Sequence, residues 1–348
     1  MKGGEIKSSD LSLIWSDSVD SKSLLDFYGA MYPNRRHYLP TIWKWQARSS
    51  FLEKNSPLVL LHKDRIIGHL GLIPLCVSLE GKRYRATLGK DLAILPEFQG
   101  HGLANLLLRK WMELPDLQMG YPNERAIGLY RKLGWKESCD SYLHFFLLKP
   151  FDNNRFVNSV PSFLRKITNT ISFPFWTVLY HRRAFPIKEL RLREVSLDSV
   201  RGLVPSSYEQ HSIVEPVHDL DYLSWRLVNS PETEKYRMLN VNDGAMVVKL
   251  VDKLHYKYVD LLCVSSESKH ADMQAMISTL AIWGLGQGYS YVRCYTKNRE
   301  LSDHLRKSLL SIVKRPHFIF GATDPTLTEE LERSSWHLEL IDGDFDDS

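Results

Sequence analysis

Two glycines stand between an apolar, strand-like run and an amphipathic helix pattern, in the segment from Gln99 to Ala104 (QGHGLA). Glycine lets the backbone turn tightly and lets consecutive N–H groups point to one place at the start of a helix. Such a group of amides binds phosphate without a lysine. The same glycines would equally suit a purely structural turn. The spacing differs from the dinucleotide-binding G-x-G-x-x-G, and no P-loop lysine follows the second glycine.

A second segment, from Asn123 to Trp135 (NERAIGLYRKLGW), has the pattern of a helix that ends at Gly134, as a C-cap glycine does. With the first segment, it resembles the GNAT acyltransferase superfamily. The first segment is similar to the family's pyrophosphate-binding signature, Q/R-x-x-G-x-G/A. The second is similar to its N-x-x-A-x-x-x-Y-x-x-x-G-F/W signature. The resemblance covers about residues 10 to 148.

The resemblance implies that the chain binds acetyl-CoA, or another acyl-CoA, as a co-substrate. The loop amides would hold the pyrophosphate, and the edge of the strand that ends at Leu95 would pair with the pantetheine amides. Asn123 would either contact the pantetheine arm or cap its own helix. The implied cofactor-binding residues are Leu95, Gln99, Gly100, His101, Gly102, Leu103, Ala104, Asn123 and Ala126.

The resemblance also implies a reaction in which an amine attacks the thioester, backbone amides meet the oxyanion, and the coenzyme A thiolate leaves. Tyr130 matches the family's general acid, which protonates the thiolate; the alternative is a core tyrosine. The family often places a carboxylate base on the strand before the loop. Asp91 is the only acid on that strand before Glu97, and the alternative for it is a solvated pair with Lys90.

The elements that must position these residues follow from hydrophobic periodicity. In the first 150 residues we predict strands over 11–15, 57–62, 66–79, 86–95, 117–120 and 135–148, and helices over 21–31, 38–49, 102–112 and 124–133. This order predicts an α+β fold around one twisted sheet.

The same order of elements recurs over residues 189–322, and Leu223-Ser224-Trp225-Arg226 echoes the aromatic segment around Trp45. We therefore predict an α+β protein of two tandem GNAT-like domains, each a central mixed twisted sheet flanked by helices. Residues 1–150 would be the acyl-CoA-binding catalytic domain, 151–188 a helical connector, and 189–348 a degenerate GNAT-like domain with an acidic C-terminal strand or tail. The second domain is called degenerate because residues 265–270 contain no glycine.

Two segments have alternative interpretations. Residues 151–188 mix aromatic and basic side chains, which is also typical of a membrane-surface helix, but Pro174 would interrupt it. Residues 323–348 carry nine acidic residues against Arg333, which is typical of a solvated tail. The segment from Trp336 to Ile341 nevertheless alternates well enough to predict one more strand.

Composition excludes several classes of protein. The 348 residues suffice for two domains, and a net charge of +4 argues against a nucleic-acid partner. The four cysteines lie far apart, and the thirteen histidines form no HxxxH pair, so we predict reduced thiols and no metal. The sequence has no signal-peptide pattern and no apolar run of spanning length, which predicts a cytoplasmic protein.

We therefore predict an acyl-CoA-dependent N-acyltransferase, in the first instance an acetyltransferase, that acts on a small amine in a ternary complex. The layout also resembles GNAT proteins of bacterial surface-polysaccharide biosynthesis, which implies an amino-sugar or sugar-nucleotide acceptor. Tyr38, Trp43 and Trp45 would stack on the sugar, and Asp342 or Asp344 would bind it. The alternatives are an aminoacyl- or peptidyl-type cell-wall transferase and a non-catalytic, coenzyme A-binding regulatory protein. A homodimer is left open.

Overall fold

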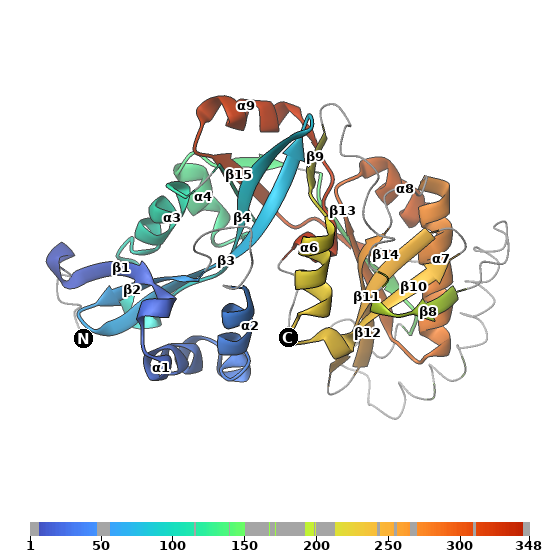
Figure 1. The fold of residues 1–348 in the computed structure, drawn as a ribbon, viewed down its shortest axis with the longest axis horizontal. Helices are drawn as coiled ribbons and strands as arrows, with labels where there is room; N and C mark the ends of the chain where they lie inside the picture. The colour runs from blue at the N-terminus through green and yellow to red at the C-terminus, as the bar shows by residue number, and fades with distance from the viewer. Residues whose placement is uncertain are drawn as a thin grey trace.

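The computed structural model shows two lobes that lie side by side, each built on its own β-sheet (Figure 1). It describes residues 7–46, 56–114, 116–138, 140–149, 192–197, 213–241, 244–253, 256–264, 270–308 and 311–343, with the single positions 167, 171 and 199. The predicted connector over 151–188 thus lies almost entirely outside the described residues.

The first lobe contains a mixed sheet in which neighbouring strands are antiparallel except for one parallel pair along its main path, β4 with β5. In spatial order its strands are β1 (Leu11–Trp15), β2 (Leu58–His62), β3 (Arg65–Leu79), β4 (Lys82–Ile94), β5 (Leu117–Gly120), β15 (Phe318–Ala322) and β6 (Lys136–Ser138). Two further strands, β9 (Ile213–Pro216) and β16 (Ser335–Trp336), extend it beside β3. Its helices are α1 (Ser21–Met31), α2 (Leu39–Gln46), α3 (Ala104–Met112) and α4 (Ile127–Lys132).

The second lobe repeats this arrangement. In spatial order its strands are β14 (Ser311–Lys314), β7 (Tyr142–Leu147), β13 (Tyr291–Thr296), β12 (Tyr256–Val264), β11 (Gly244–Lys253), β10 (Tyr236–Val241) and β8 (Leu192–Val195). Its helices are α6 (Leu220–Leu223), which runs into the π-helical turn η6 (Ser224–Val228), α7 (His270–Gly286) and α8 (Arg299–Ser308). Again a single parallel pair, β12 with β13, lies in the middle.

Each sheet contains a strand of the other half of the chain between two of its own strands. β7 follows β6 in the chain but lies in the second sheet between β13 and β14. β15 comes from the C-terminal half but lies in the first sheet between β5 and β6. Figure 1 shows β15 and the following helix on the lobe that holds α3 and α4. Both sheets therefore need strands from both halves of the chain.

This exchange changes two expectations. The prediction of one strand over 135–148 is wrong, because β6 and β7 belong to different sheets. The domain limits predicted at residues 150 and 189 divide the sequence into two halves. They do not separate the two sheets, because each sheet contains strands from both halves. The prediction of an α+β fold with two mixed GNAT-like sheets is confirmed.

The two lobes share a hydrophobic core. Leu75 and Leu88 of the first sheet lie in the same buried cluster as Met238 and Val247 of the second. Separate clusters lie under α1 to α4 in the first lobe and under α7 and α8 in the second. Because the faces of both sheets that meet here are apolar, separating the lobes would expose a core rather than a wet interface.

A pair of tryptophans joins the lobes at the sequence echo. Trp45 in α2 and Trp225 in η6 stack with ring centroids 5.0 Å apart. The Trp45 indole donates to the Trp225 carbonyl at 3.2 Å, and the Trp225 indole donates to the Trp45 carbonyl at 3.5 Å. Matching positions of the two halves therefore contact each other reciprocally.

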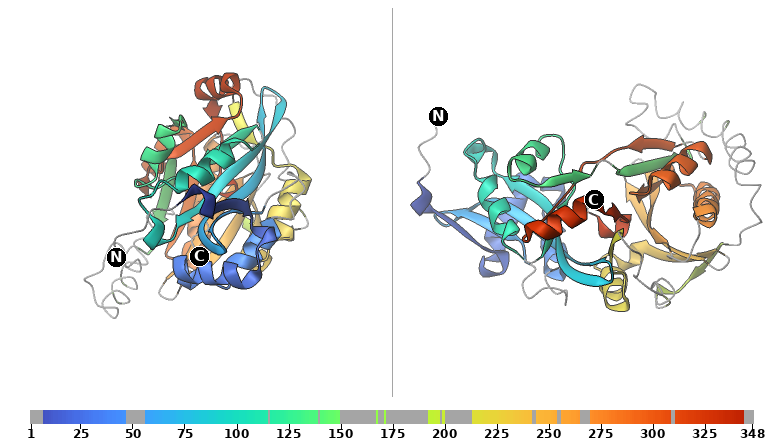
Figure 2. Two further views of the ribbon diagram at one scale, coloured as in Figure 1. Left: turned by 90° about the vertical axis from the view of Figure 1, so that its left-hand side faces the viewer. Right: turned by 90° about the horizontal axis from the view of Figure 1, so that it is seen from above.

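The C-terminal segment is folded into the molecule. The helix α9 (Pro325–Arg333) begins after Asp324, whose side chain caps it, and the chain then passes through β16 to the short 3₁₀ turn η8 (Leu340–Asp342). Figure 2 shows this end of the chain between the two lobes. The prediction of a strand over 336–341 holds only at Trp336. The interpretation of this segment as a solvated tail is wrong, because Leu340, Ile341 and Asp342 are buried.

Other expectations concern the thiols and the membrane. Cys76, Cys263 and Cys294 are free thiols, and Cys139 lies outside the described residues. Within the part of the chain that the structure describes, no helix is long and apolar enough to cross a membrane.

The strand exchange predicts that the N-terminal half does not fold alone. A fragment of residues 1–150 would lack β15, so β5 and β6 would lose their shared partner and β7 would have none. We expect no cooperative thermal transition by circular dichroism. Co-expression with a fragment of residues 151–348 should restore one. A monomeric 1–150 fragment that melts cooperatively would contradict the exchange.

Candidate active site

The parallel strands β4 and β5 part in the middle of the first sheet. They pair from Ala86 opposite Leu117 to Gly89 opposite Gly120, where β5 ends. β4 continues to Ile94 without a partner strand on that side. A substrate arm can therefore add to this open edge as a strand would.

The loop from Gln99 to Ala104 follows β4 directly and leads into α3. Gly100 and Gly102 have φ angles of +84° and +72°, a left-handed conformation that glycine adopts without strain. Among the described residues, the backbone amides from Gly100 to Ala104 have no protein acceptor. Consecutive unpaired amides at a helix start form an anion-binding site.

Neighbouring side chains fix this loop and leave its outer face open. The Gln99 side chain donates from Nε2 to the Ile94 carbonyl at 2.8 Å, which ties the loop to the end of β4. Leu103 is buried in the core, whereas His101 is exposed. A Cβ atom on Gly100 would meet nothing within 4 Å, and one on Gly102 would meet the Asn105 side-chain nitrogen at 3.6 Å, an ordinary contact distance.

Leu95, Asn123 and Ala126 have internal roles. The Leu95 amide donates to the Ile67 carbonyl of β3 at 2.9 Å. The Asn123 side-chain oxygen accepts from the amides of Arg125 and Ala126 at 3.1 and 3.0 Å, ahead of α4. Asn123 therefore holds the turn that leads into α4, whose N-cap is Ala126, and its contact with the pantetheine arm stays a prediction.

Tyr130 lies on α4 with its ring edge-on to Trp135, at 5.4 Å between centroids. Trp135 in turn packs on Trp111 of α3 at 4.7 Å. Burial raises the pKa of the Tyr130 phenol, so it keeps its proton at neutral pH. No described residue forms a hydrogen bond with its hydroxyl group. Tyr130 is thus a neutral phenol able to donate a proton.

Asp91 lies in a bulge of β4. The register between β3 and β4 shifts at this bulge, because Gly71 lies opposite Lys90 whereas His69 lies opposite Ala93. Asp91 itself has a φ of +51°. Its two carboxylate oxygens accept from the two terminal nitrogens of Arg35 at 3.0 and 3.1 Å. The interpretation as a solvated pair with Lys90 is wrong, because Lys90 is buried and Asp91 is nearly so. A catalytic base would need one of these oxygens to accept a proton, but both are hydrogen-bonded to the Arg35 guanidinium.

A buried network holds the same bulge from the side of α1. The Asp91 carbonyl accepts from Tyr32 Oη at 3.2 Å and lies 3.0 Å from His69 Nδ1. Burial lowers the pKa of His69, which stays neutral and can accept at Nε2 from the Tyr28 hydroxyl, 3.2 Å away. Arg35 and His69 were not predicted, because neither belongs to a motif and the contact joins residues 56 and 22 positions apart in the sequence.

Two of the three aromatic residues expected to stack on a sugar are used in packing, and Tyr38 is partly buried. Trp43 is buried so closely against Gly71 that a Cβ atom there would lie 1.8 Å from the indole. Trp45 stacks on Trp225. Asp342 is buried beside His218, and Asp344 lies outside the described residues.

The loop, the open strand edge and the helix with its tyrosine lie within one recognisable unit. Residues 53–137 match the family model described as an acetyltransferase (GNAT) domain. The chain carries a GNAT acyltransferase domain. This unit spans both motifs from which the resemblance was drawn.

Solved structures extend the likeness in fold to the whole chain. A GCN5-related N-acetyltransferase from Kribbella flavida superposes with a TM-score of 0.54 at 14% identity, covering 90% of this chain and 72% of that one. The N-myristoyltransferase of Saccharomyces cerevisiae, solved with bound myristoyl-CoA, superposes with a TM-score of 0.55 at 10% identity. The superposition covers 97% of this chain and 86% of that one. The sequence has no significant match among curated proteins. The two lobes are thus tandem GNAT-like domains.

The GNAT loop supports a first prediction. Valine in place of Gly102 would be strained at a φ of +72° and would put its side chain where the phosphate oxygens would bind. We expect the dissociation constant for coenzyme A, measured by calorimetry, to rise by about tenfold or more. Gly81→Val is the matched control, because Gly81 has a φ of +74° and open space around it in the β3–β4 turn. Equal affinities in the two variants would contradict this placement.

The bulge supports a second prediction, on stability. Arg35→Met would leave the Asp91 carboxylate without its cation. We expect the free energy of unfolding in urea to fall by about 2 kcal/mol, less than for a fully buried pair because some solvent reaches both side chains. The double variant Arg35→Met/Asp91→Asn should recover part of this loss. No recovery would show that the carboxylate is not what Arg35 stabilises.

Proposed function

We propose that the protein transfers an acyl group, in the first instance acetyl, from acyl-CoA to a small amine within a ternary complex. The observation that carries this proposal is the run of unpaired amides from Gly100 to Ala104 at the start of α3. A diphosphate is the ligand that fits these amides best, since each phosphate oxygen can accept hydrogen bonds from several N–H groups.

The open edge of β4 supports the delivery of the thioester. Coenzyme A held at the loop would extend its pantetheine amides along β4 between Gly89 and Leu95, where β5 no longer pairs. The acyl group would then lie at the parting of β4 and β5, next to backbone amides of the bulge. Such amides can stabilise the oxyanion that develops during acyl transfer.

The proposed reaction needs two proton transfers. A neutral amine attacks the thioester carbonyl carbon, and the C–S bond breaks as the tetrahedral intermediate collapses. The Tyr130 phenol gives its proton to the departing thiolate, while the amine nitrogen loses a proton to a base. We propose Tyr130 as the acid. Asp91, bound by both oxygens to Arg35, is better suited to hold the bulge than to accept a proton.

The acceptor is proposed only as a small amine. Since Trp43 and Trp45 are used in packing, the aromatic platform expected for an amino sugar has no support of its own. A screen of thiol release over amino sugars, sugar nucleotides, polyamines and amino acids would identify the acceptor class. Calorimetry with acetyl-CoA tests the co-substrate independently.

Tyr130→Phe tests the proposed acid. Removing the hydroxyl group should lower kcat about 100-fold, because a positioned acid contributes on that scale. The affinity for coenzyme A should not change, since the ring and its contact with Trp135 remain. Unchanged turnover would remove Tyr130 from the mechanism.

A further inference from the structure

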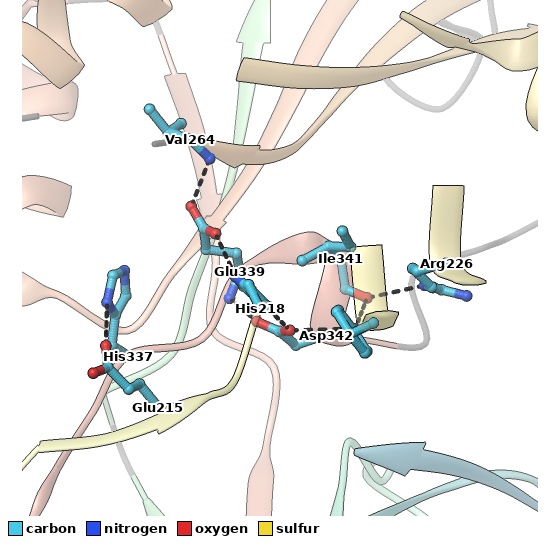
Figure 3. Close-up of polar contacts among 9 residues, drawn as sticks. Glu215, His218, Arg226, Val264, His337, Glu339, Ile341 and Asp342 are labelled. Atoms are coloured by element: carbon cyan, nitrogen blue, oxygen red, sulfur yellow. Dashed lines mark hydrogen bonds and ion pairs between the residues drawn. The ribbon is translucent and has the colours of Figure 1, made fainter. Parts of the chain in front are cut away.

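A cluster of titratable side chains lies at the boundary of the two lobes (Figure 3). Its centre is formed by Glu339, which precedes η8, by Asp342, the last residue of η8, and by His218, which precedes α6. Glu215 and His337 pair with each other at 3.7 Å beside them. None of these five residues belongs to the acyl-CoA motifs; Asp342 is buried and the other four are partly buried.

The cluster lies beside the end of the parallel strand pair of the second sheet. In the second sheet, β12 and β13 pair only up to Leu261 opposite Cys294, and η8 packs against both strands beyond that point. Glu339 Oε1 accepts from the amide of Val264, the last residue of β12. The chain's own C-terminal segment therefore occupies the opening in the second lobe.

Tyr121 connects this place to the opening in the first lobe. It follows Gly120, at which β5 leaves β4, and its ring contacts Tyr295 at the end of β13, with centroids 5.6 Å apart. Tyr295 lies on β13, and β13 packs against η8, which contains Asp342. The ring contact between Tyr121 and Tyr295 therefore connects the proposed acyl position to the element that carries Asp342.

Asp342 fixes His218. The Nε2 atom of His218 lies 2.6 Å from Asp342 Oδ1, while Asp342 Oδ2 accepts from the Glu339 amide at 3.0 Å. The Asp342 side chain is 0% exposed and His218 retains 14%, so the imidazole is held from its buried side. Burial lowers the pKa of His218, but Asp342, Glu339 and Glu215 outweigh it and raise that pKa to about 9. His218 is therefore a fixed cation at neutral pH.

Glu339 is the carboxylate that faces this cation. Its Oε2 atom lies 3.9 Å from His218 Nδ1, beyond hydrogen-bond distance, and its side chain is 14% exposed. Burial raises the pKa of Glu339 to about 7, against the opposing effects of His337 and His218. A carboxylate that titrates near neutral pH is suited to accept a proton and release it again.

We infer that Glu339 is the base that accepts the proton from the amine acceptor, with His218 and Asp342 as its positioning residues. This inference rests on the proposed function. It places the acid, Tyr130, and the base in different halves of the chain. Among the described residues, no group of three or more His, Cys, Asp or Glu side chains is arranged to hold a metal ion.

The proton balance is complete without another reactant. An ammonium acceptor gives one proton to the Glu339 carboxylate, and the neutral amine then attacks the thioester. Glu339 returns that proton to solvent through its exposed edge. The second N–H proton is lost to water as the amide forms, while the thiolate takes the proton of Tyr130, which is later restored from solvent.

The titration of Glu339 depends on every group packed against it. The groups that interact with it are His218 before α6, Cys263 on β12, Cys294 on β13, and His337 and Asp342 on its own segment, and Glu215 on β9 interacts with both histidines. Among the described residues they supply two imidazoles, two carboxylates and two thiols. The thiols stay neutral, because burial raises the pKa of both.

Glu339→Gln is the decisive variant, because the amide oxygen of glutamine can still accept from Val264. With acetyl-CoA and spermidine, glucosamine or lysine as the amine, we expect kcat/KM to fall about 100-fold or more. The acid limb of its pH profile, with an apparent pKa near 7, should disappear. Coenzyme A should bind as tightly as in the wild type. The matched control is Glu215→Gln, the same substitution at another glutamate of the cluster, which should retain the acid limb of the pH profile.

His218→Gln separates a positioning role from a structural one. Loss of the cation should raise the pKa of Glu339, so the acid limb should move to higher pH. A purely structural residue would lower activity or stability at all pH values and leave the limb in place, and that result would overturn the role of His218.

Carbon-13 NMR of glutamate carboxyl groups gives a readout that needs no acceptor. In the wild type, one resonance that is absent from Glu339→Gln should titrate near pH 7. Saturating acetyl-CoA should move its midpoint upward, because the ligand removes water from the carboxylate. A midpoint that acetyl-CoA leaves unchanged would overturn the inference even if no tested amine were acetylated.

The outcomes distinguish the two proposals. If coenzyme A gives no binding heat with the wild type, the proposed function is wrong and this inference falls with it. If coenzyme A binds while Glu339→Gln keeps the acid limb, only the assignment of Glu339 is wrong. Loss of the limb with binding intact supports both.

Discussion

The backbone hydrogen bonds of β7 and β15 tie the whole molecule together. Each strand lies between two strands of the other half, so each sheet is completed by the opposite part of the chain. An unpaired ladder position in a buried sheet costs free energy, and the exchange satisfies these positions in both lobes at once. The shared core and the Trp45–Trp225 contact follow from it, because the exchange holds the two sheets face to face.

The same arrangement makes the two lobes unequal. The first keeps the glycine loop, the open edge of β4 and the tyrosine helix. In the second, the C-terminal segment fills the corresponding opening, with Glu339 bonded to the end of β12. Among the described residues, the features that we propose for acyl-CoA binding thus lie in the first lobe. The segment that packs against the second sheet brings acidic and basic side chains to the boundary between the lobes.

Local sequence signals predicted most of the elements because each element is encoded over a short stretch. The strand at Leu11–Trp15 and the helix at Ser21–Met31 agree with the structure at both ends. The prediction of one strand over 135–148 was wrong because an apolar run does not indicate which sheet a strand joins. Nor does it indicate that the run breaks into two strands. The prediction of a solvated acidic tail was wrong because it assumed that charged residues are exposed. Asp342 is buried instead, and His218 and the Glu339 amide form hydrogen bonds with its carboxylate.

The sequence by itself determined the glycine loop, the tyrosine helix and the α+β order of the elements, since these depend on residues within one turn or one strand of each other. Only the tertiary structure decided that Arg35 holds Asp91, that β7 and β15 change sheets, and that Glu339 meets His218. The physical reason is separation along the chain. A contact between residues that lie far apart in the sequence depends on how whole elements and sheets pack, and no local propensity records that.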